Sequence, residues 1–342
     1  MTALKLCRSG LLPFCVAYAL ATAFPAPTFA GAGRTQNVAL HKGWNAIFLE
    51  VTPSTTDPEA LFAQVPVTTV ATFLSADKPV QFIRNPDSVE WNKEGWGVWY
   101  AANRPEAFLS SLHALYGHQA YLIQAQRDFV WTVAGEVLFE PLRWKSDSFN
   151  LVGFSVDEVS PPTFGQFFAG SPAHQGYRVF RLSGDTWTPV SDPISARMRS
   201  GEAFWVYCDG RSEFQGPLNA RIAAGQRVDF GERTDAWIQF RNDGQDPMNI
   251  EVETVQTESS LPVSFNVLGV KGSAMDYLSF PLPAVHKLPT LEPGSTFPLW
   301  LNLNREQMTA GSQARLLRVS SDSGAVIWIP VIGSRPGGAT AR

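Results

Sequence analysis

Two stretches of this 342-residue chain open in the same way, with an aromatic residue, an asparagine and then an apolar run. The first is Gly43 to Pro53 (GWNAIFLEVTP) and the second is Ser148 to Glu158 (SFNLVGFSVDE). The matched pairs are Trp44/Phe149, Asn45/Asn150, Val51/Val156 and Phe62/Phe167, each 105 positions apart. Agreement at one fixed spacing predicts two related units before residue 220, because a duplicated fold keeps its core positions in register.

Each unit is predicted to consist of short strands with one short helix. In the first unit, residues 34–140, a polar cap followed by Pro58 predicts that helix. The runs Ala120–Ala125 and Phe129–Glu136 alternate apolar and polar residues, so we expect them to close the unit as a hairpin. The second unit, residues 141–219, repeats this order with a shorter tail.

From residue 220 the pattern changes to seven strand-like runs separated by turn residues. The runs are RVDFG, AWIQFRNDG, NIEVETVQT, PVSFNVLG, FPLWLNLN, ARLLRVSSDSG and AVIWIPVIG. Seven short strands in about 115 residues predict an immunoglobulin-like β-sandwich over residues 220–335, with a flexible tail at 336–342. The expected fold class is mainly β: two related β-rich repeat units, each with a short helix, followed by this sandwich.

The first thirty residues, 1–30, have the pattern of a signal peptide rather than of a folded element. Lys5 and Arg8 form a basic start, LLPFCVAYALATAF forms an apolar core, and PAPTFA ends in a small residue. The apolar run is too short for a good transmembrane helix. We therefore expect export by the Sec pathway to the periplasm, the cell surface or the extracellular space, with no membrane span in the mature chain.

The net charge limits the classes of binding partner, and the cysteine content limits disulfide formation. Removing residues 1–30 takes away two basic residues and no acid, which moves the formal net charge from −4 to −6. A mildly acidic chain argues against nucleic acid, which requires a basic footprint. Cys208 is the only one of three cysteines outside the signal peptide, so no intramolecular disulfide can form. We expect a buried, inert thiol there, with an exposed thiol that pairs with a partner as the alternative.

The GWN motif at Gly43–Asn45 also carries a resemblance, together with the strings GWGVWY, RPEAFL, AYLI and SFNLVGF. These strings resemble a group of secreted bacterial proteins with GWN-type β-rich repeats followed by an immunoglobulin-like domain. The resemblance covers most of the mature chain. Its motifs lie at strand starts, turns and core aromatics, so it implies export and architecture and brings no catalytic residue.

Catalytic motifs are not found in the sequence. Ser155 lacks the second glycine of a nucleophile elbow, and there is no P-loop, H-E-x-x-H, dinucleotide fingerprint or calcium loop. His113 and His118 are five residues apart, which suits one face of neither a helix nor a strand, so solvated loop histidines are expected rather than a metal site. The sequence therefore predicts a protein without cofactor or metal that is not an enzyme.

One arrangement of carboxylates keeps an enzymatic alternative open. Glu90 and Glu94 flank Trp91 and lie close to Trp96, and sugar-cleaving clefts place two carboxylates beside an aromatic platform. A charged, exposed loop is the preferred interpretation of the same residues. A secreted glycosidase is therefore the least favoured of the functional hypotheses.

The aromatic residues of the repeat units are the candidate binding residues. Trp96, Trp99, Trp187 and Trp205 either fill cores, as large aromatic side chains usually do, or form an exposed platform. Trp96 and Trp99 are three residues apart in one strand and cannot share a face. At least one of them therefore points away from the core, unless both faces of the sheet are covered.

These observations predict an exported, non-enzymatic structural or interaction protein of the bacterial envelope or extracellular space that binds a protein partner through β-rich modules. The alternative is a carbohydrate-binding surface protein that holds polysaccharide on exposed Trp and Tyr. An exposed apolar patch or an unpaired sheet edge would favour the first hypothesis. Exposed aromatic side chains ringed by Asn, Asp or Gln would favour the second.

Overall fold

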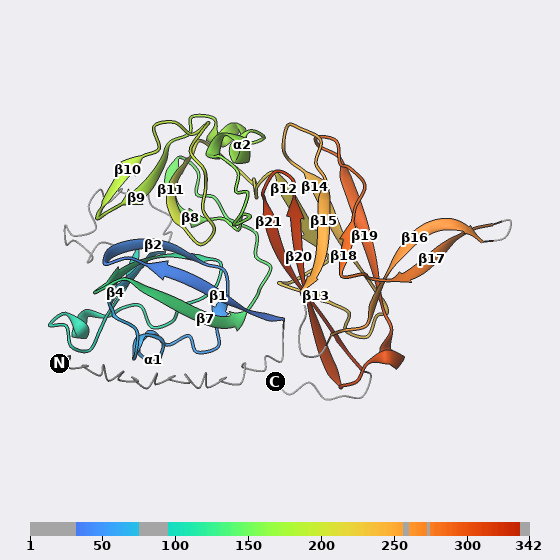
Figure 1. The fold of residues 1–342 in the computed structure, drawn as a ribbon, viewed down its shortest axis with the longest axis horizontal. Coiled ribbons are helices and arrows are strands. Elements are labelled where there is room, and N and C mark those ends of the chain that lie inside the picture. Colours follow the sequence, from blue (N-terminus) through green and yellow to red (C-terminus); the bar gives the residue numbers. More distant parts are fainter. Residues whose placement is uncertain (1–31, 75–94, 256–259, 272–273, 336–342) are drawn as a thin grey trace, which may run out of the picture.

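Five β-sheets build most of the fold, which confirms the predicted mainly β class. The computed structural model describes residues 32–74, 95–255, 260–271 and 274–335, so the predicted signal peptide and tail lie outside the described residues. In Figure 1 the two repeat units lie together on one side and the sandwich lies on the other. The helical elements within these ranges are α1 (Pro58–Phe62), α2 (Phe164–Phe168) and the 3₁₀ turns η1 (Ala107–Leu109), η2 (Pro172–His174) and η3 (Arg305–Gln307).

The first repeat unit contains two sheets that pack against each other. A three-stranded sheet has the order β1 (Gly33–Leu40), β7 (Phe129–Glu136), β3 (Thr52–Pro53). A four-stranded sheet has the order β2 (Gly43–Leu49), β6 (Gln119–Ala125), β4 (Val67–Phe73), β5 (Trp96–Tyr100). Helix α1 begins after Asp57, whose side chain accepts the backbone N–H of Glu59 at 3.1 Å, with Pro58 in the first turn.

The predicted hairpin of Ala120–Ala125 with Phe129–Glu136 is wrong, because these strands belong to different sheets. β6 pairs with β2 and β4, whereas β7 pairs with β1 over its whole length, from Gly33↔Glu136 to Leu40↔Phe129. The carboxylate of Asp128, in the connection between them, accepts the backbone N–H of Lys42 at 2.8 Å. The short turn therefore carries the chain from one sheet to the other.

The second repeat unit has a four-stranded sheet of the same design. Its order is β8 (Ser148–Gly153), β11 (Ala203–Cys208), β9 (Val179–Ser183), β10 (Thr186–Pro189), which matches β2-β6-β4-β5 strand for strand. Helix α2 occupies the place of α1 and starts with a capping box, in which the side chain of Thr163 and that of Gln166 each bond the other's backbone N–H.

The two asparagines of the repeated motif have the same structural role. Asn45 accepts the backbone N–H of His41 at 2.8 Å and donates to the carbonyl oxygens of His41 and Gly43 at 2.7 and 3.0 Å. Asn150 accepts from Lys145 at 2.8 Å and donates to the carbonyls of Lys145 and Ser148 at 3.1 and 3.0 Å. Each side chain thus closes the turn that leads into the first strand of its four-stranded sheet.

The two units are joined through the motif that opens the first of them. Gly43 has a φ of +100°, and a Cβ there would lie 2.7 Å from the carboxylate of Asp185 in the second unit, so glycine is required on both counts. That carboxylate accepts the backbone N–H of Trp44 at 2.9 Å. Further along β2, the N–H of Phe48 donates to the carbonyl of Gly201 at 2.8 Å. Backbone bonds and side-chain packing therefore connect the two units along one seam.

The C-terminal region is the predicted β-sandwich, built from two five-stranded sheets. One has the order β12 (Leu218–Ile222), β14 (Asp235–Asn242), β19 (Thr296–Leu303), β16 (Val263–Lys271), β17 (Ala274–Pro281). The other has the order β13 (Val228–Asp229), β21 (Val326–Ser334), β20 (Ser312–Ser321), β15 (Ile250–Val255), β18 (Val285–Lys287). All seven predicted strands are present, and the predicted boundary at residue 220 falls inside β12.

The sandwich encloses one apolar core and rests on the first repeat unit. Ile238, Phe240 and Leu301 from one sheet face Leu317 and Ile329 from the other, and all five are fully buried. The opposite face of the β13-β21-β20-β15-β18 sheet contributes to the core of the first unit, so this sheet is covered on both sides. None of the described helices is long and apolar enough to cross a membrane.

Candidate functional sites

The four tryptophans that were candidates for a surface platform are all buried. Their exposed fractions are 8% for Trp96, 5% for Trp99, 2% for Trp187 and 0% for Trp205. A platform must present a ring face to the ligand, which these side chains cannot do where they lie. The platform assignment is therefore corrected for these residues, and they are core residues.

Three of these tryptophans form the contact between the repeat units. Trp96 of the first unit lies edge-on to Trp205 of the second, with ring centroids 6.1 Å apart and planes at 71°. Trp187 meets the same Trp205 ring at 6.2 Å and 65°. Phe73 from β4 approaches it at 5.7 Å. Tilted and edge-to-face contacts of this kind add to the apolar burial that holds the two four-stranded sheets together.

Trp99 lies on the other face of the same strand, so both faces of the first unit's four-stranded sheet are covered. Its ring packs 5.3 Å from Phe62 of α1, and its indole N–H donates to the carboxylate of Glu59 at 3.3 Å. Trp96 faces the second unit, whereas Trp99 faces the core shared with the three-stranded sheet. Trp96 and Trp99 therefore point to opposite faces of the sheet, as their spacing requires, and both are buried because both faces are covered.

The thiol of Cys208 is buried at the end of β11. It is fully inaccessible and lies 3.3 Å from the carbonyl oxygen of Gly210. Burial raises its pKa to about 11, so the thiol stays protonated at neutral pH. The side chain is not placed to pair with a partner.

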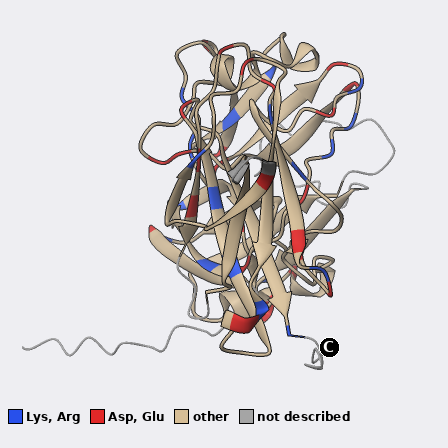
Figure 2. Ribbon diagram, turned by 90° about the vertical axis from the view of Figure 1, so that its right-hand side faces the viewer, with Lys and Arg blue, Asp and Glu red and all other residues tan. Residues whose placement is uncertain are grey.

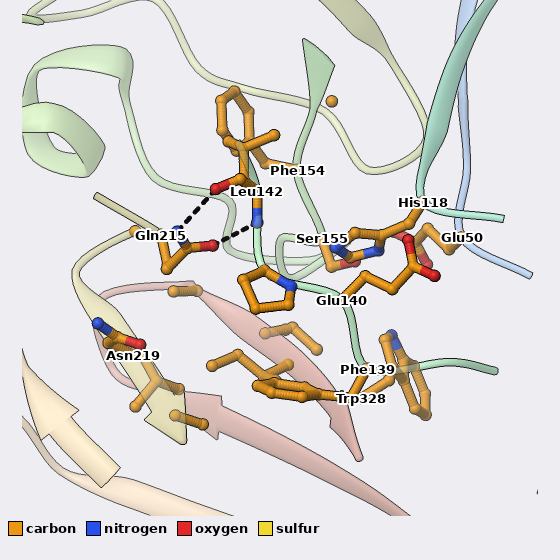
Figure 3. Close-up of a pocket in the computed structure, with 18 of the residues that line it drawn as sticks. Glu50, His118, Phe139, Glu140, Leu142, Phe154, Ser155, Gln215, Asn219 and Trp328 are labelled. Atoms are coloured by element: carbon orange, nitrogen blue, oxygen red, sulfur yellow. Dashed lines mark hydrogen bonds between the residues drawn. The ribbon is translucent and has the colours of Figure 1, made fainter. Parts of the chain in front are cut away.

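A small cavity lies where the two repeat units and the sandwich meet (Figure 3). Phe139 and Trp328 lie on one side of it and Phe154 on the other, while Gln215 ties its wall together by bonding both backbone groups of Leu142. Its volume is about 90 Å³. Sites for organic ligands usually measure about 300–1,000 Å³, so this cavity has room for a few water molecules only.

His118, Ser155 and Glu50 line one side of this cavity, yet they do not form a catalytic triad. The His118 ring bonds the backbone of Glu140 and packs 5.5 Å from Phe48, and no hydrogen bond joins it to Ser155 in the described structure. Burial lowers the pKa of His118 to about 4. His118 is half-buried, so the expectation of a solvated loop histidine is wrong for it, while His113 is exposed.

A second buried histidine, His174, lies in the core of the second repeat unit. Its ring is 4.2 Å from that of Trp144, and its Nδ1 lies 2.6 Å from the hydroxyl of Ser171. Burial lowers the pKa of His174 to about 4 as well, which keeps the ring neutral at physiological pH. Both histidines therefore serve packing, and neither is aimed at solvent.

Charged residues at the seam between the units are paired with one another. Glu50 is almost fully buried and binds the guanidinium of Arg34, which also lies 4.3 Å above the ring of Trp328. Burial lowers the pKa of Arg34 to about 10. Arg181 contacts Glu202 at 2.8 Å, and burial raises the pKa of that carboxylate. Arg34, Glu50 and Glu202 also line an open depression of about 750 Å³ between the repeat units, and the acidic and basic side chains around it compensate each other.

Metal and glycosidase sites receive no support from the described residues. No cluster of three His, Cys, Asp or Glu able to hold a metal occurs in the part of the chain that the structure describes. Glu90 and Glu94 lie outside the described residues, so the carboxylate hypothesis has no geometry attached to it.

The outermost hairpin of the sandwich is the site that the sequence did not reveal. β16 and β17 pair along their whole length, but β16 pairs with the backbone of its neighbour β19 only from Val263 to Phe265. The rest of the hairpin projects beyond the sandwich (Figure 1). It exposes large apolar side chains, with exposed fractions of 45% for Val267, 54% for Leu268, 64% for Tyr277 and 46% for Phe280.

Comparison with known proteins adds only weak likenesses. No family model matches the chain, and no curated protein matches it. A PapD-like domain of human CEP192 is 11% identical, with 36% of this chain and 87% of that chain covered and a TM-score of 0.22. The secreted serine protease VesC from Vibrio cholerae is 13% identical, with 80% and 69% covered and a TM-score of 0.22. The Enterococcus faecalis MSCRAMM ACE is 6% identical, with 89% and 84% covered and a TM-score of 0.20. Scores this low carry no argument about function.

Proposed function

We propose that this protein is an exported, non-enzymatic interaction subunit of the bacterial envelope or extracellular space, and that it binds a protein partner through the β16–β17 hairpin. The observation that carries the proposal is the exposed apolar surface on that hairpin. Soluble monomers rarely display contiguous apolar side chains unless these serve an interaction. The signal-peptide pattern and the resemblance to secreted GWN-repeat proteins support the exported location.

Both faces of the hairpin contribute to this surface. Leu268 lies directly opposite Tyr277, and Phe265 lies directly opposite Phe280 on the alternate face. Phe265 also packs against the ring of His286 at 4.1 Å, which anchors the base of the hairpin to the sandwich. The outer part of the hairpin therefore exposes apolar side chains on both faces, and its inner end is packed against the sandwich.

The edge of β17 is less available than its faces. The backbone N–H of Tyr277 is already bonded to the carboxylate of Asp276 at 2.8 Å. Pro281 has no N–H to offer at the end of the same strand. An edge interrupted in this way is a poor template for another strand. The partner therefore contacts side chains on the hairpin faces rather than extending the sheet.

Site-specific photocrosslinking in the native envelope tests the proposal. A photoreactive residue placed at Leu268 or at Tyr277 is expected to yield one stoichiometric protein adduct. The double substitution Leu268→Ser and Tyr277→Ser should reduce capture of that partner by about tenfold or more, as loss of interface hot spots does.

The matched control is Val159, an apolar residue in the second repeat unit that is 94% exposed. A photoreactive residue at this position should give no adduct with the partner. Equal labelling from Val159 and Leu268, or labelling from neither hairpin position, would show that the hairpin is not a specific interface.

A further inference from the structure

The outer face of the β12-β14-β19-β16-β17 sheet carries two tryptophans that the repeat units do not cover. Trp237 of β14 lies directly opposite Trp300 of β19. Their neighbours Ile238, Leu299 and Leu301 are buried on the inner face, so alternation places both indoles on the outside. In Figure 1 the strands β19, β16 and β17 of this sheet lie on the side of the sandwich away from the repeat units.

Neither indole is engaged by the protein. Trp300 is 40% exposed and Trp237 is half-buried, and neither stacks on another ring or donates its N–H to a protein acceptor among the described residues. The buried tryptophans behave differently: the N–H of Trp99 bonds Glu59, and that of Trp144 bonds the carbonyl of Phe214 at 2.7 Å. Each outer tryptophan therefore keeps an apolar ring and a polar N–H for a ligand.

Amide side chains lie one step along the same face from each ring. Gln239 follows Trp237 on β14, and its amide has no partner among the described residues. Asn302 follows Trp300 on β19 and donates to the Oδ1 of Asn266 on β16 at 2.5 Å. That bond fixes both amides and leaves the Oδ1 of Asn302 and the Nδ2 of Asn266 for other contacts.

Charge on this face is sparse, and it includes the exposed Arg221 of the edge strand β12, which lies directly opposite Gln239. Arg241 is paired with Asp243 at 2.8 Å, and Asp235 lies at the far end of β14. Figure 2 views the molecule from the side of the hairpin and shows basic and acidic residues interspersed, without a large region of one sign. An anionic ligand would gain little electrostatic binding free energy from such a surface. A neutral, hydroxyl-rich ligand does not depend on charge and would bind there equally well.

We propose that this face is a binding site for a neutral polysaccharide, with sugar rings resting on Trp237 and Trp300 and hydroxyl groups bonded to Gln239, Asn302 and Asn266. Sugar rings present an apolar face of C–H groups and a rim of hydroxyls. Aromatic and amide side chains that lie two residues apart, on the same face of each strand, match both features. The part of the hairpin beyond Asn266 exposes the apolar side chains of Val267, Leu268 and Tyr277 instead, which favours a different kind of occupant. The proposal does not depend on the function assigned to the hairpin.

Affinity electrophoresis of the purified protein tests the site. The gels contain soluble hydroxyethyl cellulose, xylan, galactomannan or dextran, and at least one of these should retard the wild-type protein. Trp300→Ala and Trp237→Ala are each expected to weaken that affinity by about tenfold, the equivalent of one lost ring contact. Trp300→Phe should recover part of it, because a ring is restored.

The control variant is Phe108→Ala, which removes an aromatic side chain that is 83% exposed in the first repeat unit, away from the tryptophan pair. It should leave retardation unchanged, and near-ultraviolet circular dichroism should show that all variants are folded. Retardation by none of the four polysaccharides overturns the proposal, as does retardation that survives loss of both tryptophans. Loss of the hairpin's protein crosslink in Trp300→Ala, with no polysaccharide bound, would identify the face as a protein interface instead.

Discussion

The tryptophans of this protein occupy two opposite environments, and the comparison shows what decides the role of an aromatic side chain. Between the repeat units, Trp96, Trp187 and Trp205 meet across two sheets and are buried. On the outer face of the sandwich, Trp237 and Trp300 lie opposite each other on two paired strands and are only partly covered, with Trp237 half-buried and Trp300 40% exposed. Residue type is the same in both places. A tryptophan on a covered sheet face stabilises the fold, whereas one on an open sheet face can contact a ligand.

The largest effect expected from this comparison is on Trp205. Trp205→Ala would leave a cavity between the two four-stranded sheets and lower the free energy of unfolding by about 3–5 kcal/mol. Trp300→Ala, the matched substitution on the open face, should cost less, about 1–2 kcal/mol, because 40% of this side chain is already exposed. Urea unfolding followed by circular dichroism measures both, and equal losses would show that the two environments do not differ.

The next largest effect on the free energy of unfolding is expected from the buried Glu50–Arg34 ion pair at the contact between the repeat units. Glu50→Gln removes the negative partner of the buried Arg34 guanidinium, and we expect a loss of about 1.5–3 kcal/mol, as for hydrogen bonds to charged groups. Asp235→Asn is the control on the open face, where solvent screens the charge and little should change. A similar stability for both variants in urea would contradict the assigned role of the Glu50–Arg34 pair.

A smaller change in the free energy of unfolding is expected when the pH is lowered. It should come from the histidines buried in the repeat units and not from the outer face of the sandwich. The folded pKa values of His118 and His174, about 4, lie below the ordinary value of 6.5. Their stabilising contribution is therefore complete above pH 6.5 and is lost as pH falls toward 4, because the unfolded chain binds more protons. At pH 5 the loss is about 2 kcal/mol for His174, with less for the half-buried His118.

Unfolding of wild type and His174→Gln at pH 7.5 and pH 5 measures this dependence. The variant should lose part of the difference between the two pH values. Polysaccharide retardation at pH 5 should match that at pH 7.5, since neither histidine contributes to the tryptophan face. Stability that rises on acidification would contradict the burial of these rings.

The smallest effect is expected on the hairpin. Leu268→Ser replaces a side chain that is 54% exposed and should alter the free energy of unfolding by no more than about 0.5 kcal/mol. The same change should still reduce capture of the protein partner. A loss of several kcal/mol would mean that Leu268 packs against the protein itself.

Strand alternation predicted the sandwich well and the hairpin poorly. The seven predicted strands have clear period-two patterns, whereas β17 reads AMDYLSFP, with an acid and a proline that resemble loop residues. The wrong hairpin of β6 with β7 has a different origin. Alternation identifies strands but does not say which sheet each one joins, and here the β1–β7 pairing over eight residues decided it.

The choice between core and platform for Trp96, Trp99, Trp187 and Trp205 depended on a related question, namely which sheet faces are covered. The three-residue spacing predicts that Trp96 and Trp99 point to opposite faces, but only the three-dimensional structure shows that both faces are covered. The signal for the open pair was present in the sequence. In AWIQF, Trp237 is out of phase with Ala236, Ile238 and Phe240, which marks it as a residue on the outer face. Tryptophans are denser in the repeat units, so composition favours a binding site there. The phase of Trp237 within its strand favours a site on the sandwich instead.

Double coverage of the first unit's four-stranded sheet also fixes how many repeats this architecture can hold. In solenoid proteins each repeat leaves an exposed face on which the next one stacks, so arrays can lengthen. Here the two sheets are turned toward each other, and their remaining faces pack against α1 and the three-stranded sheet in one unit and against α2 in the other. The duplication has produced a closed pair, in which the two copies cover each other's sheets and leave neither four-stranded sheet with a free face for a third copy to stack on.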